Sequence, residues 1–501
     1  MRVCLISREY PPDTGFGGIA TFTRHLAHGL KEIGHDVVVV ALAKDGNSAS
    51  LQDDGGIPVH RVVPLPIGSD LGWTSLCMPY SRYVMRTNSA LFSKFQSLHK
   101  EKSFDVVDTP ELLAEGYYPA ITKIVPMIVR LYTPHSKFIA ERLHNVTDTF
   151  DHQFVAMLER VAMLQADLIT SPSTDLAQYV AQDLGIELGE IDIVYNPIDA
   201  GEFKPDGAVA DLGRQAPTIL FVGRLEARKG IHYFIDAVPK ILASVSNAHI
   251  VVIGDDTKNA KGQSSVLTEL KEKLASNGCA DAVTFINRVP LASLPEYYRA
   301  ADVCVVPSLY DNSPYTCLEA MSCGRAVIGT DGGGTKEYLL HEQSGIIVPV
   351  KSADAIADAA IRLLQNEAER QAFADSARQR VLDVFARDQI ARKTAQLYEK
   401  AADRFKQNRN RRLCRHADER VLISADELLY KFDRMIGDAV LNASWRARLR
   451  AMKELCFKRP RLALAKTALA LANCLGCGKS ERAIKLKEQI AAKERCLLLI
   501  R

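Results

Sequence analysis

The chain has 501 residues, of which 47% are apolar and 25% are charged, and its formal net charge is +3. This composition excludes a disordered or membrane-embedded chain, and the length exceeds what one hydrophobic core usually organises. No apolar run is long enough to span a bilayer, and charged Arg8 and Glu9 directly follow the first apolar segment. We therefore expect a cytoplasmic protein of at least two domains, without a signal peptide.

The first half of the chain alternates short apolar runs with segments of helical periodicity, such as Phe22–Leu30. This alternation is typical of a parallel sheet whose strands are joined by crossover helices. The predicted strands are Val3–Ile6, Val37–Leu42, Val106–Val107, Ile128–Leu131 and Leu168–Thr170.

A polar, glycine-containing stretch from Gly201 to Ala216 precedes a second alternating series. The pattern predicts an α/β fold with two Rossmann-like, doubly wound domains facing a cleft, over residues 1–200 and 201–400. The predicted strands of the second series are Thr218–Val222, Ile250–Ile253, Val283–Ile286, Val303–Val306, Ala326–Ile328 and Ile346–Val348.

The last hundred residues differ from the rest in charge. Residues 401–501 contain 24 Lys and Arg against 11 Asp and Glu, a local net charge of +13, whereas residues 1–400 have a net charge of −10. The segment favours helix and shows no convincing strand. We predict a basic helical appendage with an anionic partner.

Glycines follow the first predicted strand and precede the predicted helix Ile19–Leu30. Gly17 and Gly18 lie in this turn. Glycine lets the backbone approach a ligand closely, and the N-terminus of a helix offers free N–H groups to an anion. A plain tight turn would use the same residues, so this feature indicates a ligand site only together with others.

Two cations follow the strand Thr218–Val222. Arg224 comes directly after Gly223, and Lys229 precedes Gly230 and a predicted amphipathic helix. Ligands of doubly wound sheets bind at the carboxyl ends of the strands. We therefore interpret the two cations as a clamp for a diphosphate that needs no metal ion.

Two carboxylates follow the strand Val303–Val306. Asp311 lies in the loop after this strand, and Glu319 lies in the next predicted helix. Carboxylates accept hydrogen bonds from ribose and sugar hydroxyls, so we expect both to face one pocket.

These features, in this order, resemble the retaining glycosyltransferases of family four, which have the GT-B fold. The resemblance covers about residues 1–400 and rests on several short motifs. They are the N-terminal glycine turn, Asn196-Pro197-Ile198-Asp199, Gly223-Arg224 with Lys229-Gly230, Pro307-Ser308, Glu319-Ala320-Met321 with Gly324, and Gly332-Gly333-Gly334 before Glu337.

The resemblance implies a role for each residue that matches the family's motifs. Arg224 and Lys229 would bind the donor diphosphate, and Glu319 would bind the ribose. Asp311 would contact the donor sugar. The supporting positions are the backbone N–H groups of Asn312 and Ser313, and Gly17 and Gly18 beside the donor phosphate and the acceptor entrance.

The chain departs from the family at two positions. The family's acidic motif usually has Glu where this chain has Asp311, which is one methylene shorter. Related sequences often place a donor-sugar His at the position of Tyr132. Either the Tyr132 hydroxyl replaces it, or His135 reaches the sugar from three residues later. Asp108 and Glu111 either face the acceptor or cap a helix, and we assign them no role.

The resemblance implies transfer of a sugar from a nucleotide diphosphate sugar to a hydroxyl of a glycan or a lipid-linked acceptor. No cofactor and no metal site are expected, since no Asp-x-Asp pair is suitably positioned. Because many relatives act on lipid-linked acceptors, we predict that residues 401–501 contact an anionic membrane at its inner face and not nucleic acid. Packing of this tail on the catalytic body is the alternative. The rival functions are a nucleotide-sugar epimerase and a non-catalytic scaffold.

Overall fold

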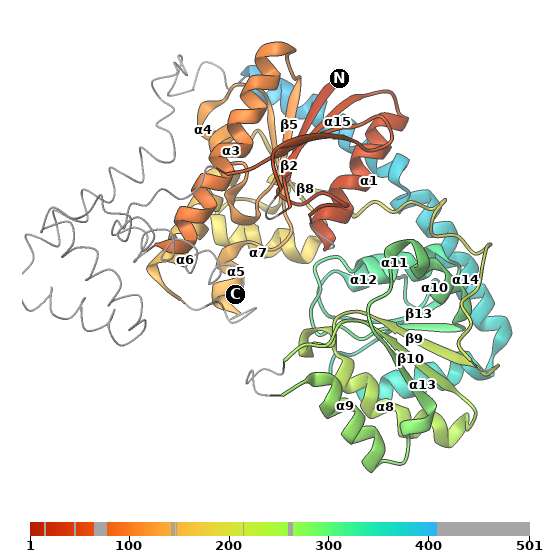
Figure 1. Cartoon of the computed structure of the whole chain (residues 1–501). Helices are drawn as coiled ribbons and strands as arrows, with labels where there is room; N and C mark the ends of the chain where they lie inside the picture. Colours follow the sequence, from red (N-terminus) through yellow and green to blue (C-terminus); the bar gives the residue numbers. More distant parts are fainter. Residues whose placement is uncertain are drawn as a thin grey trace, which may run out of the picture.

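The computed structural model describes residues 1–14, 17–44, 47–64, 78–141, 146, 148–213, 215–258 and 264–407. The predicted membrane-binding tail therefore lies outside the described residues from residue 408 onward. Within the described part, the chain forms two α/β domains, each built on its own sheet (Figure 1). The predicted fold class is confirmed.

The first domain has an eight-stranded sheet in the order β3-β4-β2-β1-β5-β6-β7-β8. All neighbouring strands are parallel except β3 and β4, which pair antiparallel at one edge. In the register, Val3 lies opposite Val37 on one side and Val106 on the other. The strands are β1 (Arg2–Ile6), β2 (Asp36–Leu42), β3 (Ser50–Asp53), β4 (Pro58–Val62), β5 (Val106–Pro110), β6 (Met127–Arg130), β7 (Leu168–Ser171) and β8 (Ile191–Ile193).

Helices cover both faces of this sheet, as buried strands without polar alternation require. One face packs side chains such as Val38 and Val107 against Phe92 of α3 and Val180 of α7. The helices of the domain are α1 (Gly18–Glu32), α3 (Pro79–Glu101), α4 (Tyr117–Thr122), α5 (His135–Ala140), α6 (Phe150–Gln165) and α7 (Thr174–Leu184).

The second domain has a six-stranded, fully parallel sheet in the order β11-β10-β9-β12-β13-β14. This is the strand order of a Rossmann fold, whose direction of winding reverses between β9 and β12. The strands are β9 (Thr218–Val222), β10 (His249–Ile253), β11 (Val283–Ile286), β12 (Val303–Val306), β13 (Ala326–Thr330) and β14 (Ile346–Val348).

Two apolar clusters fill the space between this sheet and its helices. One joins Ile219 and Ile250 to Phe234 of α8, and the other joins Leu220 and Val251 to Leu318 of α11. The helices are α8 (Ile231–Ser244), α9 (Val266–Ser276), α10 (Leu294–Ala300), α11 (Tyr315–Ser322), α12 (Thr335–Tyr338), α13 (Ala353–Gln365) and α14 (Glu367–Arg380).

The last described helix, α15 (Arg387–Gln407), returns to the first domain. Figure 1 shows it in blue beside the red helix α1. Ile390 and Tyr398 are buried in the core of the first domain, and the Tyr398 hydroxyl donates to Asp108 at 2.8 Å. The sequence pattern predicted one domain over residues 201–400. In the structure, α15 packs with the first domain instead, because its apolar side chains complete the core of that domain.

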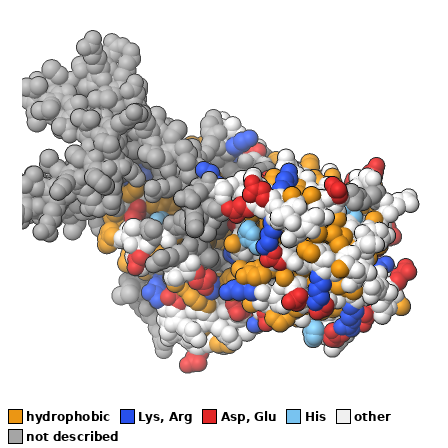
Figure 2. Space-filling model, turned by 90° about the horizontal axis from the view of Figure 1, so that it is seen from below, with side chains coloured by type: hydrophobic (Ala, Val, Ile, Leu, Met, Phe, Trp, Pro, Cys, Tyr) orange, Lys and Arg blue, Asp and Glu red, His pale blue; other side chains and the backbone are white. Residues whose placement is uncertain are grey.

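Charged side chains of both signs are interspersed over the face seen from below, with apolar side chains between them (Figure 2). Such a mixed surface is usual for a face in contact with water. Among the described residues, no helix has the length and apolar character that crossing a membrane would require.

Candidate active site

The predicted site residues of the second domain meet at the point where the winding of its sheet reverses. The loops that follow β9 and β12 leave neighbouring strands at their carboxyl ends. The Nζ atom of Lys229, from the first loop, lies 2.5 Å from Oδ2 of Asp311, from the second. Arg228 Nη1 lies 3.5 Å from the same oxygen. A charged group of each sign therefore stands at the place where doubly wound domains bind ligands.

A glycine allows these two loops to approach so closely. Gly230 is the N-cap of α8 and has a φ of +70°, in the left-handed region. A Cβ atom at this position would lie 1.7 Å from the carbonyl oxygen of Pro307. Any other residue would thus be strained and would push the loops apart.

Asp311 is held as an anion. Burial alone would raise the pKa of this carboxyl group, but the charges of Lys229 and Arg228 outweigh burial and hold the pKa below its usual value. The backbone N–H of Ser313 also donates to Asp311 Oδ1 at 3.3 Å. The carboxylate is therefore already engaged by cations and a backbone donor.

Glu319 lies nearby in α11 and is only 6% exposed. The Tyr298 hydroxyl donates to its Oε2 at 2.7 Å, and among the described residues this is the hydrogen bond that the carboxylate accepts. Burial raises the pKa of Glu319 to about 7, although the Tyr298 hydrogen bond and the charge of Lys229 act in the opposite direction. A buried carboxyl group that still has an oxygen without a hydrogen-bond partner is suited to accept a hydrogen bond from a ligand hydroxyl.

Arg224 is less tightly held than Lys229. Its side chain is 49% exposed and reaches Glu226 at 3.3 Å. Glu226 also accepts from Arg228 Nη2 at 2.9 Å. The structure thus adds the cation Arg228, and its acidic partner Glu226, to the predicted site residues. The run of basic residues Arg228 and Lys229 was the signal in the sequence, and only one of the two was singled out.

The loop of Asp311 also reaches the first domain. The side-chain amide of Asn312 donates to the carbonyl oxygen of Tyr132 and, at 2.6 Å, to Thr133 Oγ1. The Asn196 amide donates to the carbonyl oxygen of Ser313 at 3.1 Å. The predicted residues Asn312, Ser313 and Tyr132 therefore meet where the two domains face each other.

Two buried carboxyl groups accept hydrogen bonds from the backbone of the loop that contains Tyr132 and His135. The backbone N–H of Tyr132 donates to both oxygens of Glu111, each at 2.8 Å. The backbone N–H of His135 donates to Glu159 at 2.6 Å. Burial raises the pKa of Glu111 to about 8 and that of Glu159 well above its usual value. Glu111 is thus a support of this loop, whereas Asp108 pairs with Arg130 at 2.6 Å.

Tyr132 and His135 differ in their surroundings. The Tyr132 ring meets Phe22 edge-on at 5.7 Å, and burial raises the pKa of its hydroxyl well above the usual value. The His135 ring is bonded to His152 at 2.9 Å and stacks on Tyr80. Burial, reinforced by the charge of His152, lowers the pKa of His135 to about 4. His135 is therefore a neutral member of an aromatic cluster of the first domain.

The glycine turn lies opposite the second domain. Gly17 is the N-cap of α1, and a Cβ atom on Gly18 would lie 4.0 Å from the ring of Tyr315 in α11. The start of α1 thus faces the helix that contains Glu319. Residues of both domains therefore border the site.

Models of two glycosyltransferase families match the two domains in turn. The model described as glycosyltransferase family 4 matches residues 16–202, and the model described as glycosyl transferases group 1 matches residues 208–380. The fold and the paired matches define an enzyme that transfers sugars from nucleotide-sugar donors. The chain is a glycosyltransferase of the GT-B fold, of the family-four type.

Curated relatives span both domains. An uncharacterized glycosyltransferase of Methanocaldococcus jannaschii is 28% identical over 412 residues, covering 80% of this chain and 99% of its own. Glycogen synthase of Mycobacterium tuberculosis is 27% identical, covering 79% and 94%. Phosphatidyl-myo-inositol mannosyltransferase of Mycolicibacterium smegmatis is 26% identical, covering 76% and 88%.

Solved structures share the fold. Sucrose-phosphate synthase of Thermosynechococcus elongatus superposes with a TM-score of 0.64 at 23% identity, covering 80% of this chain and 98% of its own. The Anabaena protein HepE, solved with UDP and glucose, superposes with a TM-score of 0.59 at 18% identity, covering 80% and 99%. The predicted family, fold and enzyme class are confirmed.

Proposed function

We propose that the chain is a retaining glycosyltransferase that uses a nucleotide diphosphate sugar and needs no metal ion or other cofactor. The contact that carries the proposal is the pair of Lys229 and Asp311, 2.5 Å apart at the carboxyl ends of adjacent parallel strands. Glu319 and Arg224 flank this pair. Together they offer the groups that a diphosphate, a ribose and a sugar hydroxyl each need.

The cations stabilise the leaving group. As the bond between sugar and phosphate breaks, negative charge develops on the nucleotide diphosphate. Fixed positive charges that face this developing charge lower the barrier, because they need no rearrangement at the moment of reaction. Lys229, Arg228 and half-exposed Arg224 supply these charges from one loop. In other transferases, a bound metal ion provides this stabilisation of the leaving diphosphate.

The acidic groups orient the donor. Glu319 binds the ribose through the oxygen that Tyr298 does not occupy. Asp311 binds a hydroxyl of the sugar while Lys229 keeps it ionised. An Asp311 carboxylate that is engaged by two cations is a weak nucleophile. We propose instead that the acceptor hydroxyl attacks from the face of the leaving group and passes its proton to the departing diphosphate oxygen, so that the bond from the anomeric carbon to the phosphate oxygen is replaced on the same face and the configuration is retained.

The acceptor lies on the side of the first domain, near Gly18 and the Tyr132 loop. Among the relatives, one name specifies glycogen and another a phosphatidylinositol, so both a glycan and a lipid-linked acceptor fit the type. Attachment of residues 401–501 to an anionic membrane stays a prediction. Full-length protein would then sediment with anionic vesicles, and a chain ending at Gln407, which keeps α15 whole, would not.

A transfer assay tests the proposal. The full chain, with nucleotide sugars and a set of glycan and lipid acceptors in the presence of a chelator, is expected to release nucleotide diphosphate only when a suitable acceptor is added. NMR of the product is expected to show the anomeric configuration of the donor. An inverted product, or complete loss of transfer with chelator, would contradict it. Conversion of the donor sugar without an acceptor would favour an epimerase.

A further inference from the structure

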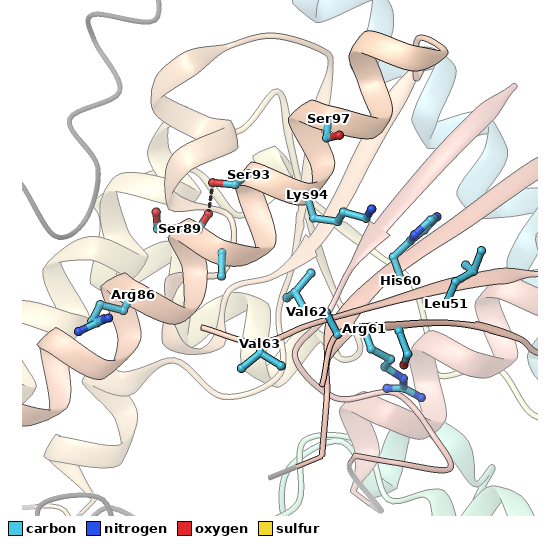
Figure 3. Close-up of a pocket in the computed structure, with 13 residues that line it drawn as sticks. Leu51, His60, Arg61, Val62, Val63, Arg86, Ser89, Ser93, Lys94 and Ser97 are labelled. Atoms are coloured by element: carbon cyan, nitrogen blue, oxygen red, sulfur yellow. Dashed lines mark hydrogen bonds between the residues drawn. The ribbon is translucent and has the colours of Figure 1, made fainter. Parts of the chain in front are cut away.

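A cavity of about 690 Å³ lies on the outer edge of the first domain. Figure 3 shows its lining, with the edge strand β3 and its neighbour β4 on one side and helix α3 on the other. None of the lining residues belongs to the interdomain site. The volume falls within the range of about 300–1,000 Å³ that small-molecule sites occupy.

The lining is basic. It includes Arg61, Arg86, Lys94 and His60, and no Asp or Glu among the residues that line it in the described part of the chain. Figure 3 shows the Lys94 side chain extending from α3 toward His60 of β4. Among the described residues, Lys94 forms no ion pair. A positive charge without a counter-charge is thus left inside a concave surface.

Arg61 serves a different purpose. It is 1% exposed, and its guanidinium donates to the carbonyl oxygens of Tyr10 at 2.8 Å and Pro11 at 3.0 Å. Its charge is therefore directed into the first domain, away from the cavity. Arg86 is also buried, at 6% exposed, so Lys94 and His60 are the most accessible basic groups of the lining.

The pKa of His60 reports the same positive potential. Burial lowers this pKa, and the charges of Lys94 and Arg2 lower it further, while Glu101 acts in the opposite direction. His60 therefore favours the neutral form, in which one ring nitrogen donates a hydrogen bond and the other accepts one. A neutral donor beside an ammonium group suits an anionic oxygen.

The remaining lining is divided between hydroxyl groups and apolar side chains. Ser89, Ser93 and Ser97 follow one another at four-residue spacing on one face of α3. Across from them, Leu51 is 64% exposed and Val63 is 45% exposed. These side chains give the concave surface an apolar portion against which the apolar part of a ligand could pack.

We infer that this cavity binds a small organic phosphate. Its anionic group faces Lys94 and His60, the Ser89 hydroxyl of α3 supplies a further hydrogen bond, and its apolar part covers Leu51 and Val63. The hydroxyls of Ser93 and Ser97 already donate to Ser89 O and Glu101 within the helix. The site is separate from donor binding, so it acts as an additional subsite or an effector site of the enzyme. A free phosphorylated metabolite and a phospholipid headgroup share this chemistry.

Calorimetric titration of the full chain with hexyl phosphate, inorganic phosphate and hexanol tests the inference. Hexyl phosphate is expected to bind at least tenfold more tightly than either of the others, because it alone has both parts. Lys94→Gln, alone and with His60→Gln, is expected to weaken this binding at least tenfold. Lys100→Gln, on the same helix outside the cavity, is the matched control and is expected to change nothing.

Vesicles containing phosphatidylglycerol distinguish the two sources of phosphate. If hexyl phosphate displaces the protein from vesicles and Lys94→Gln weakens vesicle binding, the site binds a phospholipid headgroup. If neither change affects vesicle binding, the site binds a free metabolite. Equal binding of hexyl phosphate by wild type and both variants, or no binding at all, would overturn the inference. Nucleotide diphosphate binding is expected to be unchanged in the variants. Failure of the cavity proposal can therefore be distinguished from failure of the proposed donor site.

Discussion

The two sides of the interdomain site are held in place by different means. In the second domain, a glycine lets two backbones approach, since a Cβ atom on Gly230 would lie 1.7 Å from Pro307 O. In the first domain, the buried carboxyl groups of Glu111 and Glu159 accept hydrogen bonds from the backbone of the Tyr132–His135 loop. The first arrangement fixes charged side chains, and the second fixes a backbone whose side chains stay neutral.

This difference indicates a division of labour. The charged side of the site is suited to bind and stabilise the diphosphate, and the neutral side is suited to shape the space around the sugar. Substitutions on the charged side should therefore change donor affinity and rate. Substitutions of Glu111 or Glu159, which accept hydrogen bonds from the Tyr132 loop, should change the stability of the fold and its dependence on pH.

The largest effect is expected from Lys229→Ala. This change removes a cation from the leaving group and leaves Asp311 buried without its nearest partner. The value of kcat/KM is expected to fall about a hundredfold, which corresponds to ~2.7 kcal/mol. Lys240→Ala, an exposed lysine of α8 that pairs with Asp358, is the control. Steady-state kinetics with equal losses in both variants would contradict the assignment.

A smaller effect is expected from Arg224→Ala. Its guanidinium is half-exposed, so water screens its charge. We expect the affinity for nucleotide diphosphate, measured by calorimetry, to fall about fivefold, or ~1 kcal/mol. A loss that exceeds that of Lys229→Ala would reverse the order of importance within the charged side.

The pH dependence of donor binding should report Glu319. The pKa of this carboxyl group is about 7, raised by burial, so lowering the pH from 8 to 6 protonates it. If the anion binds the ribose, affinity is expected to fall up to about tenfold at pH 6, where about one carboxyl group in ten is ionised. Glu319→Gln is expected to bind weakly at both values. A wild-type affinity that does not change between pH 6 and pH 8 would show that ionised Glu319 does not bind the ribose.

An effect on stability rather than on donor binding is expected from Glu111→Gln. Burial raises the pKa of Glu111 to about 8 in the folded state, above the unfolded value of about 4.3. Between these values the folded state binds more protons, so this group lowers stability as the pH rises. The gain in Tm of Glu111→Gln relative to wild type is therefore expected to grow from pH 5 to pH 8. A constant difference would mean that Glu111 is ionised throughout.

The sheets could be predicted from the sequence because their central strands are continuous apolar runs, such as Ile250–Ile253. The strands β3, β4 and β8 were missed. Ser50–Asp53 and Pro58–Val62 contain polar residues and a proline, and β8 has only the three residues Ile191–Ile193. Of these strands, β3 and β8 are the edges of the sheet, where one side of the strand is unpaired. The return of α15 to the first domain depends on tertiary packing that no local pattern reveals.

The charged side of the site could also be predicted, because its residues lie beside glycines in recognisable motifs. Lys229 and Asp311 were expected to bind a donor, and the structure brings them together. Tyr298 and Glu159 were missed, because each reaches the site from a helix distant in sequence. A residue that contributes one hydrogen bond from a distant helix leaves no local signature.

The central claim is that Lys229, Asp311 and Glu319 form a donor site for a nucleotide diphosphate sugar. Calorimetric titration of the full chain with the common nucleoside diphosphates, in the presence of a chelator, tests it most directly. At least one of them is expected to bind to wild type, and binding is expected to be lost in the double variant Lys229→Ala, Glu319→Gln. Binding that is equal in wild type and in a folded double variant would contradict it.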